Sequence, residues 1–273
     1  MQQQTLAEAV QCTGIGLHSG KPVSLRLVPA PPDSGICFVR MDLPGQPQIQ
    51  ARAELVTSVM RATTLSDGDA TVYTIEHLLS ALHMLGVDNC RVEMDAPEPP
   101  VLDGSAKEFA ELILRAGRLE QAAEREEVRL QEAVTVRDAD RFIAILPYDG
   151  LRVSYTSVNP HPLLGVQYID LELDEATFLR EIAPARTIGY LHEVEALQKK
   201  GLGLGGSLEN VVVYSDDAVL TPLRYPDELV RHKVLDILGD IFLAGPVRGH
   251  IIAVKSSHAL NTALARQIAG RAR

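Results

Sequence analysis

The sequence contains no tryptophan, few aromatic residues and only three cysteines among its 273 residues. Those cysteines, Cys12, Cys37 and Cys90, are odd in number, and none belongs to a C-x-x-C pair. A disulfide scaffold and a thiolate zinc site are therefore excluded. We expect three reduced thiols that are buried in the core.

The sequence also lacks any hydrophobic run of the roughly 18 to 20 residues that cross a bilayer, and its N-terminus does not resemble a secretory signal. Basic residues are outnumbered: 26 Lys and Arg against 36 Asp and Glu give a formal net charge of −10. That sign disfavours binding to the phosphates of nucleic acid. We therefore expect a cytoplasmic monomer with no integral membrane segment and no nucleic-acid partner. A lipid-like substrate stays open, because a pocket can hold an acyl chain without a membrane span.

Hydrophobic residues make up 46% of the chain, enough for a core that folds without a metal or disulfide staple. In the first half, short alternating segments predict strands at 23–28 and 36–41, and a third at 91–95. Residues 107–117 predict an amphipathic helix. An earlier helix is indicated by apolar residues at helical spacing: Ile75, Leu78, Leu79, Leu82 and Leu85.

The polar, acidic stretch 118–132 predicts an exposed linker between two domains. After it the pattern restarts with strands and helices. Each half thus combines several strands with two main helices, which predicts an α+β fold of two similar, layered domains, 1–122 and 128–273. In the second half we expect strands at 128–136, 141–147, 151–157, 166–173, 209–214 and 249–255, and helices at 191–200, 226–243 and from 257. We also expect a short helix after Asp174, which could serve as its N-cap.

The segment Gly201-Leu-Gly-Leu-Gly-Gly206 formally matches the G-x-G-x-x-G pattern of dinucleotide sites. Such a site needs a strand before the glycines and a helix after them. Here a predicted helix precedes them and a predicted strand follows. We interpret the segment as a flexible or closely packed loop.

A polar stripe runs along the predicted helix 226–243. His232 and Asp236 are four residues apart, which places them on one face, and Asp240 continues that face. A buried stripe of this kind costs free energy unless something satisfies it. The spacing allows both His232 and Asp236 to bind one zinc ion. A solvated helix edge with a capped histidine is the alternative.

Two further histidines could complete a site. His77 follows Glu76 inside a leucine-rich helix, where a histidine is usually a satisfied core residue. If it meets His232 and Asp236 in space, it becomes a third ligand that leaves zinc an open position. His258 lies at a strand-to-helix junction. It could cap the helix, or it could act as a general acid if a carboxylate orients its imidazole.

These residues belong to a series of motifs that spans nearly the whole chain. The order and separations of these motifs give the chain its likeness to a known family. It resembles the zinc-dependent UDP-3-O-acyl-N-acetylglucosamine deacetylases of bacterial lipid A synthesis. The motifs that carry the resemblance are Thr13-Gly-Ile-Gly-Leu-His-Ser-Gly20, Thr74-Ile-Glu-His-Leu-Leu79, Asp103-Gly-Ser-Ala106, Ala185-Arg-Thr187, Leu204-Gly-Gly-Ser207, Arg231-His-Lys-Val-Leu-Asp236 and His258-Ala-Leu-Asn261.

The resemblance implies two domains packed as a layered sandwich, with the active site between them. It also implies one Zn²⁺ as cofactor and a division of roles among six side chains. Glu76 is the implied general base, and His258 is the implied cationic or proton-donating partner, oriented by Asp240. The implied zinc ligands are His77, His232 and Asp236.

The resemblance also implies contacts with the substrate. Thr187 would contact the oxyanion and Lys233 the substrate. The segment 187–207, including Gly205 and Ser207, would form an apolar passage for the acyl chain. Three departures from the family pattern, Ile188, Gly203 and Thr63 near the passage, leave the acyl-chain length and the fit of inhibitors open.

The implied reaction is hydrolysis of the N-acetyl group of UDP-3-O-acyl-N-acetylglucosamine, the committed step of lipid A synthesis. Zinc would activate a water molecule, and Glu76 would take its proton as it attacks the amide. Either Glu76 or His258 could then protonate the leaving amine. The alternatives are a zinc deacetylase acting on another acylated amino sugar and a non-catalytic, metal-stabilised scaffold, which would need neither Glu76 nor His258.

Overall fold

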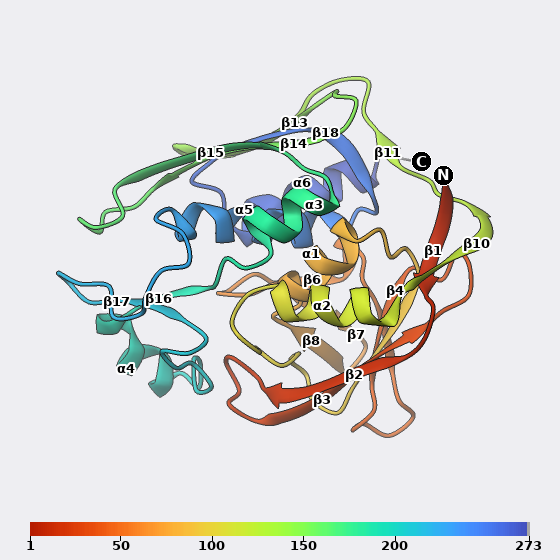
Figure 1. The fold of residues 1–273 in the computed structure, drawn as a ribbon, viewed down its shortest axis with the longest axis horizontal. Coiled ribbons are helices and arrows are strands. Elements are labelled where there is room, and N and C mark those ends of the chain that lie inside the picture. Colours follow the sequence, from red (N-terminus) through yellow and green to blue (C-terminus); the bar gives the residue numbers. More distant parts are fainter. Residues whose placement is uncertain (272–273) are drawn as a thin grey trace.

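The two halves of the chain repeat one arrangement of strands and helices, seen in a computed structural model that describes residues 1–271 (Figure 1). The first sheet has the order β2-β3-β9-β4-β5 and the second the order β12-β13-β18-β14-β15. In each, the third and fourth strands are parallel and the other neighbours antiparallel. The strands are β2 (Val10–Ile15), β3 (Pro22–Pro29), β4 (Ile36–Arg40), β5 (Gln48–Gln50) and β9 (Cys90–Met94), then β12 (Val134–Asp138), β13 (Arg141–Leu146), β14 (Leu151–Val158), β15 (Val166–Glu172) and β18 (Val247–Val254).

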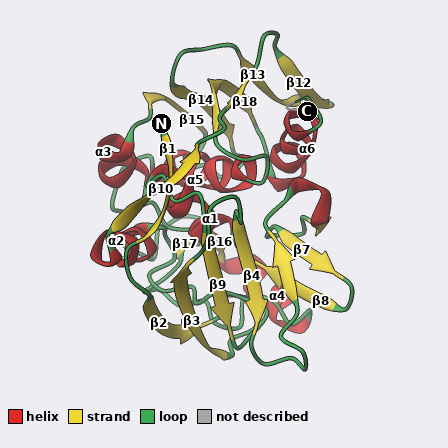
Figure 2. Ribbon diagram, turned by 90° about the vertical axis from the view of Figure 1, so that its right-hand side faces the viewer, coloured by secondary structure: helices red, strands yellow, loops and turns green. Residues whose placement is uncertain are grey.

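In each half, one helix precedes the central strand and another follows it. In the first half these are α1 (Glu76–Met84) and α2 (Lys107–Ala116), and in the second α5 (Glu228–Phe242) and α6 (His258–Ala269). The helices lie between the two sheets (Figures 1 and 2). One continuous apolar core includes residues of both sheets and all four helices. The α+β prediction of two similar layered units is confirmed.

Hydrophobic patterning explains which faces are buried. Along β18 buried and part-exposed side chains alternate, as expected for a strand with one face on the core. By contrast, α5 is buried along nearly its whole length because α1, α6 and the second sheet surround it. Its polar stripe therefore cannot be a solvated edge.

Each half also carries one insertion that the other half lacks. In the first half it is a small three-stranded sheet of β6 (Val56–Ser58), β7 (Thr64–Asp67) and β8 (Ala70–Tyr73), preceded by the short turn η1 (Ala53–Leu55). In the second half it is β16 (Ile188–Tyr190), α4 (Leu191–Lys199) and β17 (Val212–Tyr214), with β16 parallel to β17. This second insertion projects from the layered body in Figure 1.

Several local predictions need correction. Part of the expected linker is a strand, β10 (Arg118–Glu124), which pairs with β1 (Gln2–Leu6). The expected strand 128–136 is divided into β11 (Val128–Arg129) and β12, because β11 pairs with β18 while β12 pairs with β13. By contrast, the short helix predicted after Asp174 is confirmed: α3 (Glu175–Thr177) continues into η2 (Phe178–Ile182). Asp174 accepts a hydrogen bond from the Thr177 amide there, as an N-cap does.

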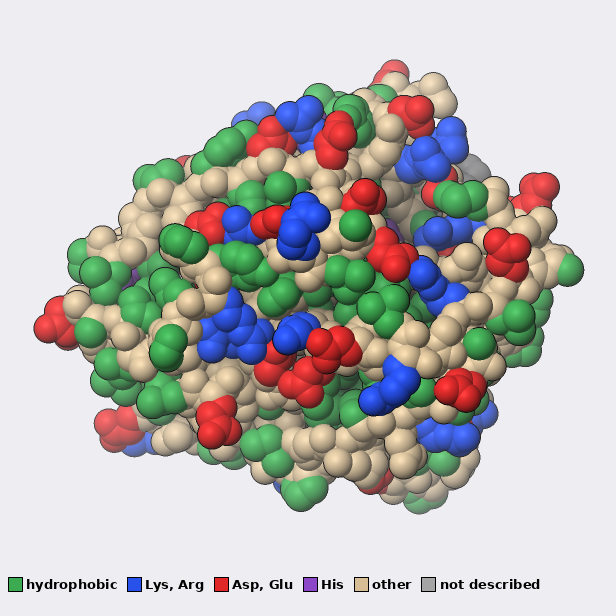
Figure 3. All heavy atoms as spheres, viewed as in Figure 1, with side chains coloured by type: hydrophobic (Ala, Val, Ile, Leu, Met, Phe, Trp, Pro, Cys, Tyr) green, Lys and Arg blue, Asp and Glu red, His purple; other side chains and the backbone are tan. Residues whose placement is uncertain are grey.

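Among residues 1–271, no helix is both long and apolar enough to cross a lipid bilayer. On the face shown in Figure 3, basic and acidic side chains are interspersed. That face presents no broad basic surface of the kind that follows a nucleic-acid backbone.

One close approach between the two halves is a backbone contact of α1 with α5. A Cβ atom on Gly239 would lie 2.0 Å from the carbonyl oxygen of Glu76. Only glycine can therefore occupy position 239 at the observed spacing of the two helices. The contact sets the distance between side chains that the two helices present to each other.

We predict that Gly239→Ala lowers the free energy of unfolding by about 1–3 kcal/mol, because the methyl group forces the helices apart. Urea denaturation would measure this. Gly270→Ala is the matched control, since its nearest atom would lie at an ordinary 3.5 Å. Equal stability of the two variants would contradict the packing argument.

Candidate metal and catalytic site

The helix contact brings one side chain of α1 to two side chains of α5, about 150 residues later in the sequence. His77 lies on α1, and His232 and Asp236 lie one turn apart on α5; one ligand atom from each falls within 4.8 Å of the others. Asp236 Oδ1 is 3.3 Å from His232 Nε2 and 3.8 Å from His77 Nε2. All three residues are buried. The three groups proposed as metal ligands thus converge on one point.

The chemistry of this cluster fits a divalent cation. Burial lowers the pKa of His232, and burial together with His232 lowers the pKa of His77 to about 3, so both imidazoles are neutral. Burial alone would raise the pKa of Asp236, but His232 and Lys233 hold it well below its usual range. Asp236 Oδ1 is buried and has no hydrogen-bond partner. Two neutral imidazoles and an unpartnered carboxylate oxygen are the donor set of an open zinc site.

Neighbouring groups orient the ligands. Nδ1 of His232 lies 3.1 Å from the carbonyl oxygen of Ala185, an arrangement that leaves Nε2 free to bind a metal. Next to that carbonyl, Arg186 forms an ion pair with Glu228, at 2.8 Å from Nε to Oε1, and both side chains are buried. The Arg186 amide donates to the same carboxylate. The pair therefore fixes the segment that holds His232.

Glu76 and His258 meet beside the ligand cluster. His258 Nε2 lies 3.8 Å from Glu76 Oε1, and its Nδ1 is 2.8 Å from Asp240 Oδ2. Asp240 also accepts a hydrogen bond from Asn261 Nδ2 at 2.9 Å. This geometry matches the orienting role that the resemblance implies for Asp240.

Burial and neighbouring charges shift the pKa values of both Glu76 and His258. Burial raises the pKa of Glu76 to about 7, against the opposing effect of His258. Burial lowers the pKa of His258, but the carboxylates of Asp240 and Glu76 outweigh it and raise that pKa to about 10. Near neutral pH the pair holds a cationic imidazole beside a carboxyl group that can exchange a proton.

Thr63 lies under this pair. It is fully buried, its amide donates to Glu76 Oε2 at 3.1 Å, and its hydroxyl donates to Asp240 Oδ1 at 2.5 Å. From the resemblance to the family, Thr63 was expected near the acyl passage. Instead it connects the carboxylates of Glu76 and Asp240, a contact that no local pattern in the sequence indicates.

A cavity of about 610 Å³ opens over these side chains. Thr187 and Lys233 line it, as expected from the resemblance, and Lys233 Nζ lies 2.8 Å from Asp236 Oδ2. Other lining residues were not predicted: Arg61, Arg141, Tyr155 and Lys255. The cavity therefore combines the ligand cluster with several cationic side chains.

A second cavity, of about 400 Å³, is lined mainly by β16, α4 and the loop between α4 and β17. Leu17, Thr187 and Ile188 line both cavities, so the two adjoin each other. Most of its other side chains are apolar, as an acyl passage requires: Tyr190, Leu191, Val194, Leu197, Leu208, Val211, Val213 and Leu220.

The glycine-rich loop forms part of this passage wall. Gly203 and Ser207 line the cavity. Gly203 has a φ of 68°, a left-handed conformation that favours glycine over the larger residues common in the family. Gly205 instead packs against Gly16, whose carbonyl oxygen would lie 2.2 Å from a Cβ at that position. Its predicted contact with substrate stays a prediction.

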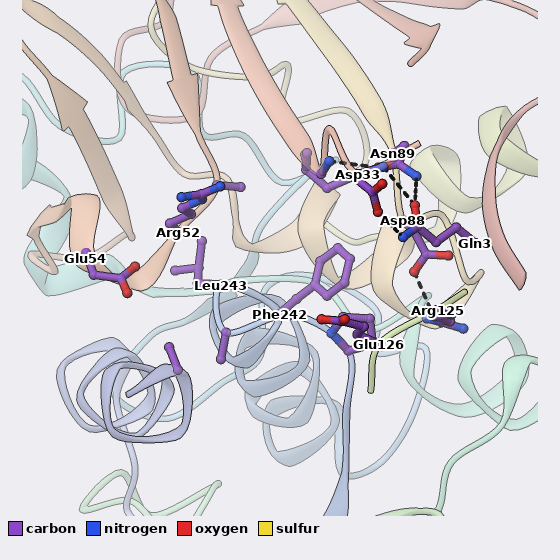
Figure 4. A pocket seen from close by; sticks show the side chains of 17 residues that line it. Gln3, Asp33, Arg52, Glu54, Asp88, Asn89, Arg125, Glu126, Phe242 and Leu243 are labelled. Carbon is purple, nitrogen blue, oxygen red and sulfur yellow. Dashed lines mark hydrogen bonds and ion pairs between the residues drawn. The ribbon is translucent and has the colours of Figure 1, made fainter. Parts of the chain in front are cut away.

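A third cavity, of about 530 Å³, lies at the C-terminal end of α5 (Figure 4). Phe242 faces it, and Asp88 and Arg125 form an ion pair in its wall, 2.9 Å from Oδ1 to Nε. None of the predicted ligands or catalytic side chains lines it. We therefore place the functional site at the first cavity, which the ligand cluster lines.

Comparisons with known proteins identify the family of the chain. A family model described as UDP-3-O-acyl N-acetylglycosamine deacetylase matches residues 3–270. Three similar proteins bear the name UDP-3-O-acyl-N-acetylglucosamine deacetylase. One from Anaeromyxobacter sp. (strain Fw109-5) is 48% identical over 97% of this chain and 88% of its own length. One from Myxococcus xanthus (strain DK1622) is 47% identical, over 97% and 86%. One from Neisseria meningitidis serogroup C is 42% identical, over 98% and 90%. The resemblance inferred from the motifs is confirmed.

We predict that Arg186→Met lowers the free energy of unfolding by about 3–5 kcal/mol, because Glu228 stays buried without its partner. Arg26→Met is the control: its ion pair with Glu93 is 3.4 Å long, the Arg26 side chain is 52% exposed, and its loss should cost no more than about 1 kcal/mol. Urea denaturation of both variants checks the difference. Similar losses would mean that the buried pair is not a structural support.

Proposed function

The chain belongs to the UDP-3-O-acyl-N-acetylglucosamine deacetylase family, and we propose that it is a zinc-dependent hydrolase of the N-acetyl group of UDP-3-O-acyl-N-acetylglucosamine. Its products are acetate and UDP-3-O-acyl-glucosamine, and its place is in lipid A synthesis. The observation that carries the mechanism is the unpartnered Asp236 Oδ1 between His77 and His232, beside Glu76 and His258. We propose further that it acts as a cytoplasmic monomer.

The two adjoining cavities suit the two ends of this substrate. The apolar cavity along β16 and α4 would take the acyl chain. The larger cavity would take the sugar and the nucleotide, and its cationic side chains would face the diphosphate: Arg61, Arg141, Lys233 and Lys255. A substrate that spans both cavities places its sugar at their junction, next to Thr187.

His77, His232 and Asp236 would hold the metal ion, which when bound polarises a carbonyl and lowers the pKa of water. Glu76 then acts as general base on the attacking water. Its pKa near 7 places proton uptake close to the working pH, where a general base is most effective. The Thr63 amide fixes one carboxylate oxygen of Glu76.

His258 supplies positive charge and a proton at the leaving amine. Asp240 holds its Nδ1, so Nε2–H points toward Glu76 and the catalytic cavity. The raised pKa keeps the imidazole protonated until the amine leaves. We assign protonation of the leaving group to His258, and Glu76 removes the proton from water.

Charge that develops on the acetyl oxygen needs donors nearby. Thr187 lines the junction of the two cavities, where its hydroxyl can donate to this oxyanion. Lys233 is held over the site by Asp236 and brings a cation toward the substrate. Both roles depend on the segment that the buried Arg186–Glu228 pair supports.

We predict that acetate release from UDP-3-O-acyl-N-acetylglucosamine is lost after chelation and restored by one equivalent of Zn²⁺. The direct measurement is chelator-sensitive acetate release with metal content determined in parallel. Asp236→Ala should bind zinc at least about tenfold more weakly, since one of three ligands is gone. Full activity in a protein shown to be metal-free would contradict the mechanism.

We predict that His258→Ala keeps bound zinc but loses at least about 100-fold in kcat, the usual contribution of a general acid. The measurement is kcat together with zinc stoichiometry. His250→Ala is a suitable control, because His250 lies on β18 and bonds Ser154 instead of the site. Wild-type turnover in the His258 variant would remove its assigned role.

A further inference from the structure

Glu98 is a buried carboxylate that the mechanism above does not use. It lies in the proline-rich loop that follows β9 and is fully buried. Its Oε2 accepts hydrogen bonds from the amides of Ser19, at 3.0 Å, and His18, at 3.2 Å. Its Oε1 accepts from the His18 amide at 3.0 Å and from the Thr74 hydroxyl at 2.8 Å. One side chain therefore joins two segments that are more than 50 residues apart.

All of these donors are uncharged groups. A buried carboxylate is costly unless several donors surround it closely, and hydrogen bonds to an ionised acceptor are stronger than neutral ones. The arrangement holds both segments tightly, because moving either one leaves a buried charge with fewer donors. Glu98 thus acts as a rigid link between its two partners.

One partner leads directly into the catalytic helix. Thr74 has a φ of 56°, an unusual conformation for a β-branched residue. It lies two residues before Glu76 and lines the catalytic cavity. Strained backbone of this kind persists only where its surroundings enforce it. The bond to Glu98, with the Tyr73 amide bonded to the Pro97 carbonyl at 3.0 Å, provides that constraint.

The other partner is the turn that carries Leu17 and His18, which line the acyl passage. Gly16 lies so close that a Cβ there would be 2.3 Å from Glu98 Oε2. The glycine-rich loop then bonds to this turn: the amide of Gly205 donates to the Leu17 carbonyl at 3.0 Å, and the amide of Leu204 to the His18 carbonyl at 3.2 Å. The passage wall is thereby attached to Glu98.

We propose that Glu98 is a positioning residue that fixes the acyl passage relative to the catalytic helix, and so lets a long acyl chain place the acetamide beside Glu76. The inference rests on the proposed function. A long chain anchored in a displaced passage would misplace the reacting carbon, whereas a short chain that does not fill the passage would be affected less. Misplacement by about 1 Å can cost as much as 100-fold in rate.

The test compares kcat/KM for two substrates, UDP-N-acetylglucosamine with a long 3-O-acyl chain and with a 3-O-acetyl group. For Glu98→Ala we expect the long-to-short ratio of kcat/KM to fall at least about tenfold, mainly through the long substrate. A loss of folded enzyme lowers both values equally and leaves the ratio unchanged. An unchanged ratio would overturn the proposal.

Two conservative variants separate geometry from charge. In Glu98→Gln the amide oxygen can accept from His18 and Ser19 while the NH₂ group donates to the Thr74 hydroxyl. Only the second contact of the His18 amide, with Oε1, is lost, so the ratio should stay within about threefold of wild type. Glu98→Asp keeps the charge but is one methylene shorter, so the ratio should fall even if the alanine variant does not fold. A glutamine variant as impaired as the aspartate variant would contradict a positioning role.

Asp95→Ala is the matched control, because Asp95 lies in the same loop and accepts the Ser24 amide at 2.7 Å on the exposed side. Its ratio should equal that of wild type. A second readout is the affinity of the metal-free protein for a fluorescent long-chain fatty acid. This affinity should fall about tenfold in Glu98→Ala. If wild type releases no acetate, the proposed function fails, and the binding measurement alone decides whether Glu98 shapes the passage; unchanged fatty-acid affinity would then overturn the inference.

Discussion

The site depends on one backbone contact, the approach of α5 to α1 at Gly239. Because no side chain separates the helices there, the carbonyl of Glu76 lies against α5. His77, the next residue, is then within metal-binding distance of His232 and Asp236. A larger spacing would leave two half-sites, each with too few ligands to bind zinc. The packing of two similar units thus produces a centre that neither unit contains alone.

The buried carboxylates around the ligand cluster are tolerated because specific neighbours bond most of their oxygens. Asp240 is fully buried, yet it receives bonds from Thr63, His258 and Asn261. Lys233 pairs with one oxygen of Asp236. The other oxygen, Oδ1, is the exception, and it points to the place where a cation fits. An orphaned buried acceptor is costly in an ordinary core, so its presence here is a mark of function.

The sequence predicts those parts of the site that one element carries. His232 and Asp236 share a helix face, so their spacing allows a metal site, with a solvated helix edge as the alternative. That His77 joins them follows only from long-range packing, and it was expected from the resemblance of the motifs. Thr63 and Glu98 were not predicted, because each acts through backbone amides and hydroxyls distant in the sequence. The strand β10 was missed because its exposed acidic residues suggest a linker, whereas pairing with β1 decides its structure.

In the repeated architecture, the proposed catalytic side chains and the residues that would select the substrate lie largely on different elements. The equivalent helices α1 and α5 carry the proposed ligands and the proposed base, while the two insertions differ and line part of the two adjoining cavities. Both insertions are nevertheless connected by hydrogen bonds to the elements that carry the proposed catalytic side chains. Thr63, between β6 and β7, bonds both Glu76 and Asp240. The glycine-rich loop of the second insertion reaches the catalytic helix through the turn at His18 and the carboxylate of Glu98. A change in either insertion should therefore alter catalysis as well as substrate choice, since buried hydrogen bonds leave little room for independent movement.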